Sequence, residues 1–141
     1  GFDRMKLGNW DSGTLATQEF LNQLTNLFSA SDRNKRAGAS FALETWAGYG
    51  IGHGAEAESS NFWFQLVAGC KALGVPTGFF IYHANLERAH VESVEHELEE
   101  AFFHPEFNQE EWFMGARETL KALSMFWTGL DETRRQLETA Q

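Results

Sequence analysis

Apolar residues recur along most of the chain at intervals of three and four residues, and strand-like alternation of useful length is absent. This spacing matches the period of an amphipathic α-helix. The sequence therefore predicts an all-α fold, a bundle of about five helices in a single domain over residues 1–141. The expected helices follow a turn-rich segment at 1–13 and cover residues 15–30, 33–49, 76–102 and 108–137, with a third helix that starts between 56 and 60 and ends at 73.

Polar residues and glycines mark the expected helix boundaries. Thr14 or Thr17 can cap the first helix, because a hydroxyl oxygen accepts a free backbone N–H there. Gly74 is placed to end the third helix. Glycines at alternate positions over 48–54 predict a loop or a distorted segment, since glycine disfavours a continuous helix.

Two helices carry patterns that predict how they pack. The second helix has a cluster of small residues, which predicts close approach of a neighbouring element: Ala37, Gly38, Ala39 and Ala42. The last helix has an apolar seam at three-four spacing, which is typical of a bundle. The seam consists of Phe113, Ala116, Leu120, Leu123, Trp127, Leu130 and Leu137.

Three polar residues interrupt the apolar face of the fourth expected helix, at the spacing His83-x3-Glu87-x2-His90. At about 100° of turn per residue, Glu87 lies about 40° to one side of His83 and His90 about 20° to the other. Apolar residues share this direction: Phe79, Phe80, Leu86, Val94, Leu98 and Ala101. Because burying polar groups without partners is costly, these three must be paired, hydrogen-bonded or bound to a metal.

Imidazole and carboxylate together are the ligand set for zinc, iron or manganese. Glu44 lies on the inward face of the second helix and is the best further ligand in the chain. The sequence thus predicts metal ligands at Glu44, His83, Glu87 and His90. The same residues also fit a hydrogen-bonded core network with Glu87 at its centre and Glu44 at the surface. The residues alone leave both interpretations open.

Other polar residues carry weaker signals. His53, Glu56 and Glu58 flank the glycine-rich segment and are loop ligands, substrate contacts or solvated residues. Cys70 sits among apolar residues mid-helix and is expected to be a small core residue. No glycine-rich phosphate loop, Gly-x-Ser-x-Gly or Cys-x2-Cys motif is present, so nucleotide binding and nucleophilic catalysis have no support.

Composition narrows the class of partner. A net charge of −9 argues against nucleic acid and anionic membranes, which require a basic surface. No segment approaches the roughly 20 apolar residues that span a bilayer, so no membrane partner is expected. A single cysteine excludes an intrachain disulfide and predicts a reducing, cytoplasmic location.

The stretch from Phe79 to His90 resembles the last metal-binding helix of the haem-oxygenase-like di-iron oxidases and oxygenases. This family includes the CADD-like proteins and is related to the thiaminase-II and PQQ-synthesis folds. Its helix typically reads Phe-Phe-x2-His-x3-Asp-x2-His, and this chain reads Phe79-Phe80-Ile-Tyr-His83-x3-Glu87-x2-His90. Phe-Ala-Leu-Glu44-Thr-Trp resembles the upstream helix that supplies one carboxylate. The resemblance covers about residues 37–130.

The resemblance implies a haem-oxygenase-like fold and an iron cofactor, as one ion or two, that activates O2 to oxidise a small organic substrate. It implies iron ligation by Glu44, His83, Glu87 and His90. The substrate pocket would be lined by aromatic residues: Trp46, Trp63, Phe79, Phe80 and Tyr82.

Two departures from the family pattern change what is expected of the chain. Glu87 stands where the family has Asp, and the first ligand half, a Glu followed by Glu-x6-His, has no counterpart in residues 1–36. The chain therefore resembles the C-terminal part of such an enzyme, and is expected to form a homo-oligomer or to pair with a missing N-terminal half.

Two alternatives belong to other classes of protein. One is a metal-free helical binding or interaction module, in which the His/Glu cluster is structural. The other, ranked last, is a thiaminase-II-like hydrolase, which needs a nucleophilic cysteine; the apolar setting of Cys70 disfavours it.

Overall fold

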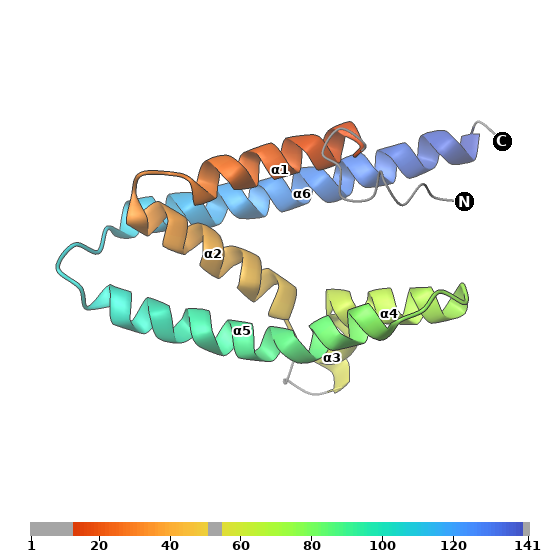
Figure 1. Ribbon diagram of the computed structural model, residues 1–141, viewed down its shortest axis with the longest axis horizontal. Helices are drawn as coiled ribbons and strands as arrows, with labels where there is room; N and C mark the ends of the chain where they lie inside the picture. Colours follow the sequence, from red (N-terminus) through yellow and green to blue (C-terminus); the bar gives the residue numbers. More distant parts are fainter. Residues whose placement is uncertain (1–12, 51–54, 140–141) are drawn as a thin grey trace. The chain divides into compact units, whose positions relative to one another are not determined.

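The computed structural model describes residues 13–50 and 55–139. Six helices and no strand occupy these ranges (Figure 1), which confirms the predicted all-α class. The helices are α1 (Leu15–Phe28), α2 (Arg33–Gly48), α3 (Ala55–Ser60), α4 (Phe62–Ala72), α5 (Gly78–Phe102) and α6 (Gln109–Thr139). None of these helices is long and apolar enough to cross a membrane.

Local capping explains where several helices begin and end. The Thr14 hydroxyl accepts the backbone N–H of Thr17 at 3.2 Å and caps α1, as predicted. Asp32 Oδ1 accepts the N–H of Lys35 at 2.9 Å at the start of α2. After α4, Gly74 has φ of +69°, the left-handed conformation that favours glycine at the end of a helix.

A single third helix starting between Glu56 and Ser60 is predicted, but the structure has two helices there, α3 and α4, separated at Asn61. Asn61 has extended backbone angles, and its Oδ1 accepts the N–H groups of Trp63 and Phe64 at 2.9 and 3.4 Å. Satisfying these two donors starts a new helix at Phe62. The helical period continues across this break, which is why periodicity alone predicts one helix.

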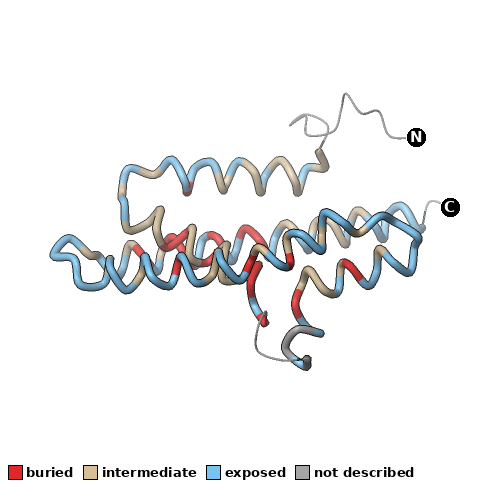
Figure 2. Tube along the Cα trace, turned by 60° about the horizontal axis from the view of Figure 1, so that its bottom comes forward, coloured by how far each residue is buried: buried red, intermediate tan, exposed pale blue. Residues whose placement is uncertain are grey.

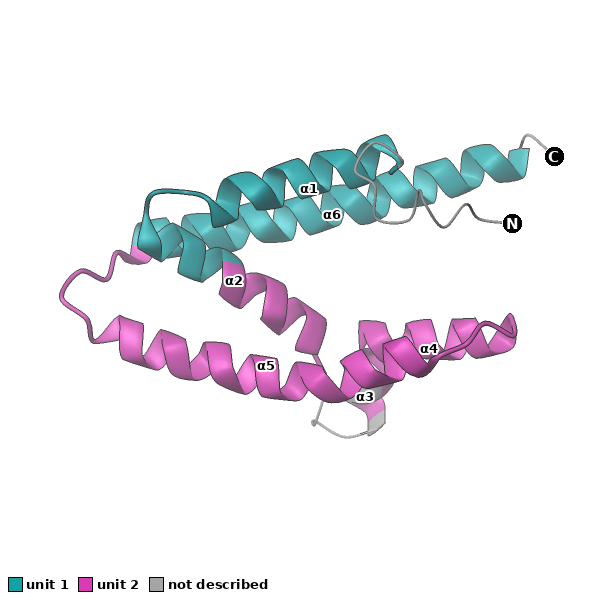
Figure 3. Cartoon of the chain, in the orientation of Figure 1, with its two compact units in different colours: residues 1–39, 110–141 teal, residues 40–109 magenta. Residues whose placement is uncertain are grey.

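The chain divides into two compact units (Figure 3), residues 1–39 with 110–141 and residues 40–109. Unit 1 contains α1, the first part of α2 and α6. Unit 2 contains the rest of α2 and α3 to α5. The prediction of a single domain over 1–141 stays a prediction.

In unit 1, α2 and α6 pack at backbone distance. A Cβ on Gly38 would overlap the carbonyl oxygen of Trp112, and a Cβ on Gly115 would overlap that of Lys35. Ala39 beside this contact is fully buried. The small residues of α2 therefore mark a close helix approach, as predicted. Stacking of Phe20 on Phe126, with ring centroids 4.8 Å apart, joins α1 to α6.

The predicted seam of α6 is partly wrong. Phe113 and Leu120, which belong to that seam, are 45% and 48% exposed. Ala116 and Leu123 of the predicted seam are buried, and the other buried positions are Trp112, Gly115, Thr119 and Ala122. The buried face is rotated toward glycine and alanine because α6 contacts α2 through these small residues. Periodicity predicts a different face because glycine and alanine are less apolar than phenylalanine and leucine.

In unit 2, the C-terminal part of α2 packs on α5. A Cβ on Gly48 would overlap the Val91 side chain, so glycine allows the two helices to approach. The buried residues of α5 are Ala84, Glu87 and Val94, and α4 contributes Val67. Figure 2 shows the buried positions along each helix in red. A glutamate thus occupies a core position of this unit.

Candidate metal centre

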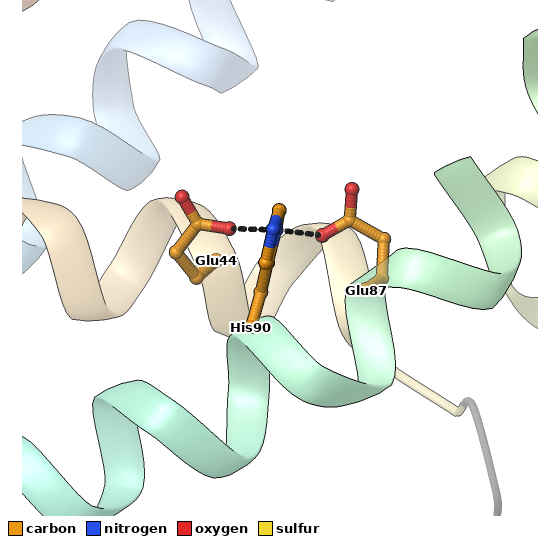
Figure 4. Close-up of side chains that lie close together, drawn as sticks. All are labelled: Glu44, Glu87 and His90. Atoms are coloured by element: carbon orange, nitrogen blue, oxygen red, sulfur yellow. Dashed lines mark ion pairs between the residues drawn. The ribbon is translucent and has the colours of Figure 1, made fainter. Parts of the chain in front are cut away.

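Glu44, Glu87 and His90 meet where α2 faces α5 in unit 2 (Figure 4). Glu87 and His90 are three residues apart on α5, which places their side chains on one face of the helix. Glu44 reaches them from α2, one turn before Gly48. The close approach at Gly48 therefore brings residues from distant parts of the sequence into one cluster.

The imidazole of His90 lies between the two carboxylates, as Figure 4 shows. Its Nδ1 is 3.1 Å from Glu44 Oε2 and 3.4 Å from Glu87 Oε2. One ligand atom from each residue falls within 4.8 Å of the others. Three donor atoms at this separation can converge on a single cation.

Burial is uneven across the cluster. The Glu87 side chain is 5% exposed, whereas those of Glu44 and His90 are 31% and 39% exposed. Glu87 Oε2 and His90 Nδ1 are nonetheless buried atoms, and neither makes a hydrogen bond of acceptable geometry within residues 13–50 and 55–139. Buried polar atoms normally have a hydrogen-bond partner, so these two atoms can instead offer their lone pairs to a metal ion. The residues therefore fit a metal.

Electrostatics point the same way. Burial raises the pKa of Glu87 above its ordinary value, and repulsion from Glu44 adds to the rise, while His90 and His83 act in the opposite direction. A buried carboxylate beside a second carboxylate is unfavourable when both are ionised. A bound divalent cation would remove that cost.

His83, the fourth predicted ligand, lies outside this three-residue cluster. Its Nδ1 is 3.8 Å from Glu87 Oε1, the oxygen that does not face His90. Trp63 stacks on the His83 ring with centroids 5.1 Å apart and planes 17° apart, and the Phe79 ring lies 4.3 Å away. Glu87 thus directs its two oxygens toward two different imidazoles.

The aromatic residues predicted to line a pocket gather around His83. Trp63 contacts Phe80 at 6.5 Å between centroids, and Tyr82 meets the His83 ring edge-on at 5.7 Å. Helix α4 packs against this end of α5 on the side of Phe80 and His83. It leaves Phe79 and Tyr82 64% and 63% exposed. The expectation that Phe79 belongs to the buried face is therefore wrong.

Among the remaining predicted residues, Trp46 connects to the aromatic group through Phe62, whose ring centroid lies 5.1 Å from that of Trp63. Trp46 packs against Phe62 on α4, with ring centroids 5.2 Å apart. Glu56 is exposed and Cys70 is half-buried. His53 and the side chain of Glu58 lie outside the described residues.

Asn61 supports the site and was missed by sequence reasoning. It is 1% exposed, and its Nδ2 donates to the carbonyl oxygens of Ala47 at 3.2 Å and Tyr49 at 2.5 Å. The same side chain caps α4 through Trp63 and Phe64. Asn61 therefore ties the end of the Glu44 helix to the helix that supplies Trp63. An asparagine before an aromatic run is the N-cap signal that could have revealed it.

No protein-family profile, curated protein or solved structure matches the chain. The resemblance to the haem-oxygenase-like di-iron enzymes thus stays a prediction, and the case for function rests on the residues of the site.

Proposed function

We propose that the chain binds ferrous iron through Glu44, Glu87 and His90 and acts as an oxidase or oxygenase on a small organic substrate. The observation that carries this proposal is the cluster itself. Three ligand atoms lie within 4.8 Å of one another, and the buried atoms Glu87 Oε2 and His90 Nδ1 face each other at 3.4 Å without a hydrogen bond of normal geometry. A solvated surface cluster would not bury these two atoms.

The donor set favours a hard or borderline transition metal. Two carboxylates and one imidazole, with no thiolate, suit iron, manganese or zinc, and three protein ligands leave coordination positions open. The resemblance of the Phe79–His90 stretch to the di-iron family favours iron among these. When bound, ferrous iron supplies the electrons and the open positions that O2 activation needs.

His83 and Glu87 support a second ion. Glu87 Oε1 faces His83 at 3.8 Å while Oε2 faces His90 at 3.4 Å, so a carboxylate lies between two imidazoles. With iron on both sides, Glu87 would be shared and His83 would be a ligand of the second ion. With one ion, His83 would hold the distal oxygen of Glu87 in place, as outer partners of metal ligands do.

The aromatic residues would hold the substrate and limit water at this end of the site. Trp63 and Phe79 lie directly against His83, and Phe80 and Tyr82 extend the same surface. An apolar surface of this kind suits a substrate with a hydrocarbon or aromatic body. Trp46 would contribute from the α2 side through Phe62.

Iron content is the direct test. Protein produced in iron-supplemented medium should retain at least one equivalent of iron per chain, and Glu87→Gln and His90→Ala should lose it because each removes a ligand. His96→Ala is the matched control, since His96 is exposed on α5 and lies 3.4 Å from Glu100. Oxygen consumption that depends on iron and disappears in the same two variants would establish the activity.

The alternative is a metal-free interaction module in which His90 pairs with both carboxylates. The 3.1 Å separation of His90 Nδ1 and Glu44 Oε2 favours it. In that case wild-type protein would retain no iron, and His90→Ala would lower stability by leaving Glu87 buried without its partner.

A further inference from the structure

The turn between α4 and α5 and the start of α5 form an apolar tip, residues 71–82, hereafter the hairpin tip. It exposes five large apolar side chains, from 42% for Ile81 to 81% for Leu73: Leu73, Val75, Phe79, Ile81 and Tyr82. Figure 2 colours the turn between α4 and α5 as exposed. Clustered exposed apolar side chains mark an interaction surface.

These side chains leave α5 in different directions. At about 100° per residue, Tyr82 lies about 60° from Phe79, whereas Ile81 lies about 160° away, on the opposite side of α5. A folded protein partner covers one face of a helix end and would leave part of this group in water. A lipid surface surrounds an inserted tip on every side.

The charge pattern of the hairpin matches a lipid interface. From Ser59 to Leu86 the single charged residue is Lys71, although the chain carries 31 charged residues and a net charge of −9. Lys71 stands at the base of the tip, where its ammonium could reach lipid phosphates while the apolar groups enter the acyl region. Tyr82 is of the type enriched at membrane interfaces.

We propose that the hairpin tip inserts into the surface of a bilayer with zwitterionic headgroups. None of the described helices is long and apolar enough to span a membrane, so the proposed contact is interfacial. The acidic remainder of the chain disfavours anionic lipid, which agrees with the expectation from net charge. This inference goes beyond the proposed iron chemistry and does not depend on it.

Insertion would bring the candidate centre close to the lipid boundary. The Phe79 ring lies 4.3 Å from the His83 ring, and His83 faces Glu87. An apolar molecule dissolved in the bilayer would therefore meet the aromatic side of the site directly.

Flotation with phosphatidylcholine vesicles tests the proposal. Wild-type protein should float with the vesicles. The Leu73→Gln/Val75→Gln variant should bind at least about tenfold more weakly, because two apolar side chains no longer leave water. Leu15→Gln/Leu137→Gln is the matched control, since these leucines are 71% and 63% exposed on α1 and α6. It should float like the wild type.

Several outcomes would overturn the proposal. These are failure of the wild type to float, equal binding by both double variants, or stronger binding to phosphatidylserine than to phosphatidylcholine. A dimer that dissociates in Leu73→Gln/Val75→Gln, with no flotation, would assign the tip to a second copy of the chain instead. Circular dichroism checks that each variant is folded.

A fluorescent readout is independent of the glutamine variants. A nitrobenzoxadiazole label on Leu73→Cys, in a Cys70→Ala background, should brighten when phosphatidylcholine vesicles are added. Unchanged emission would contradict insertion of the tip.

Discussion

Helix α2 makes two close contacts with opposite chemistry. In unit 1, Gly38 meets the α6 backbone at Trp112, and the neighbouring Ala39 is fully buried. In unit 2, Gly48 meets α5 at Val91, one turn after α2 presents Glu44 to Glu87 and His90. The first contact buries small apolar groups and stabilises its unit. The second buries a carboxylate next to another, which folding alone does not favour.

The two contacts of α2 differ in the polar groups they bring together, not in how closely the helices approach. Glycine gives close approach in both places, so approach alone does not define a site. What distinguishes the second contact is its chemistry, because two carboxylates and an imidazole converge there with ligand atoms within 4.8 Å of one another. Such groups cost stability unless a ligand or an ion satisfies them.

The largest expected effect is on the apolar contact. Gly38→Ala places a methyl group against the Trp112 carbonyl oxygen, a backbone atom that cannot move aside without shifting α6. We expect unfolding free energy to fall by about 3 kcal/mol, measured by urea denaturation. Gly69→Ala on α4 is the control, because its Cβ meets no described atom within 4 Å. A Gly38→Ala protein as stable as the control would show that this contact is not tight.

Asn61→Ala should have the next largest effect. It removes the donor to the Ala47 and Tyr49 carbonyl oxygens and the cap of α4. We expect a loss of about 2 kcal/mol in urea denaturation, because the buried Ala47 carbonyl, the Tyr49 carbonyl and the first N–H groups of α4 lose their partner.

Asn61→Asp separates the two roles of this residue. It keeps an oxygen to cap α4 but removes the donor to α2, so its stability should fall between those of wild type and Asn61→Ala. Equal stability of Asn61→Asp and wild type would mean that the tie to α2 contributes nothing.

Much of the fold follows from the sequence, whereas the rotation of each helix does not. Periodicity and caps located α1, α2 and α5, because both signals are local. The buried face of α6 was misjudged because its neighbour is a glycine of α2, distant in sequence. The break at Asn61 was missed because a single polar side chain, and no change of period, causes it.

The candidate site shows the same limit. The angular position of each residue around its helix predicts that Glu44, Glu87 and His90 point inward, and the fold brings them together. It also grouped His83 with them, although the imidazole of His83 faces the other oxygen of Glu87. A helical direction specifies a face to within tens of degrees, and only the neighbouring helices decide which atoms meet.

A smaller effect is expected from the pH dependence of metal-free protein. Burial raises the pKa of Glu87 above 4.5, so the folded protein holds this proton more tightly than the unfolded chain. The stability it contributes is complete below the unfolded pKa and is lost as pH rises through the raised folded pKa. Metal-free Glu87→Gln should therefore melt above wild type at neutral pH, and the difference should shrink in acid.

The exposed Glu92→Gln on α5 is the control for that melting experiment and should match wild type at each pH. If metal-free Glu87→Gln melts below wild type at neutral pH, the ionised carboxylate is part of a stabilising network, and the comparison between the two α2 contacts fails.

Anaerobic calorimetric titration of metal-free protein with ferrous iron tests the central claim most directly. We expect saturable binding by wild type and by His96→Ala. Binding by Glu87→Gln and His90→Ala should be at least about 100-fold weaker, because losing a ligand costs more than the 10- to 100-fold lost with a residue that only hydrogen-bonds to a ligand. Absence of binding by folded wild-type protein, or equal affinity in all four proteins, would contradict it.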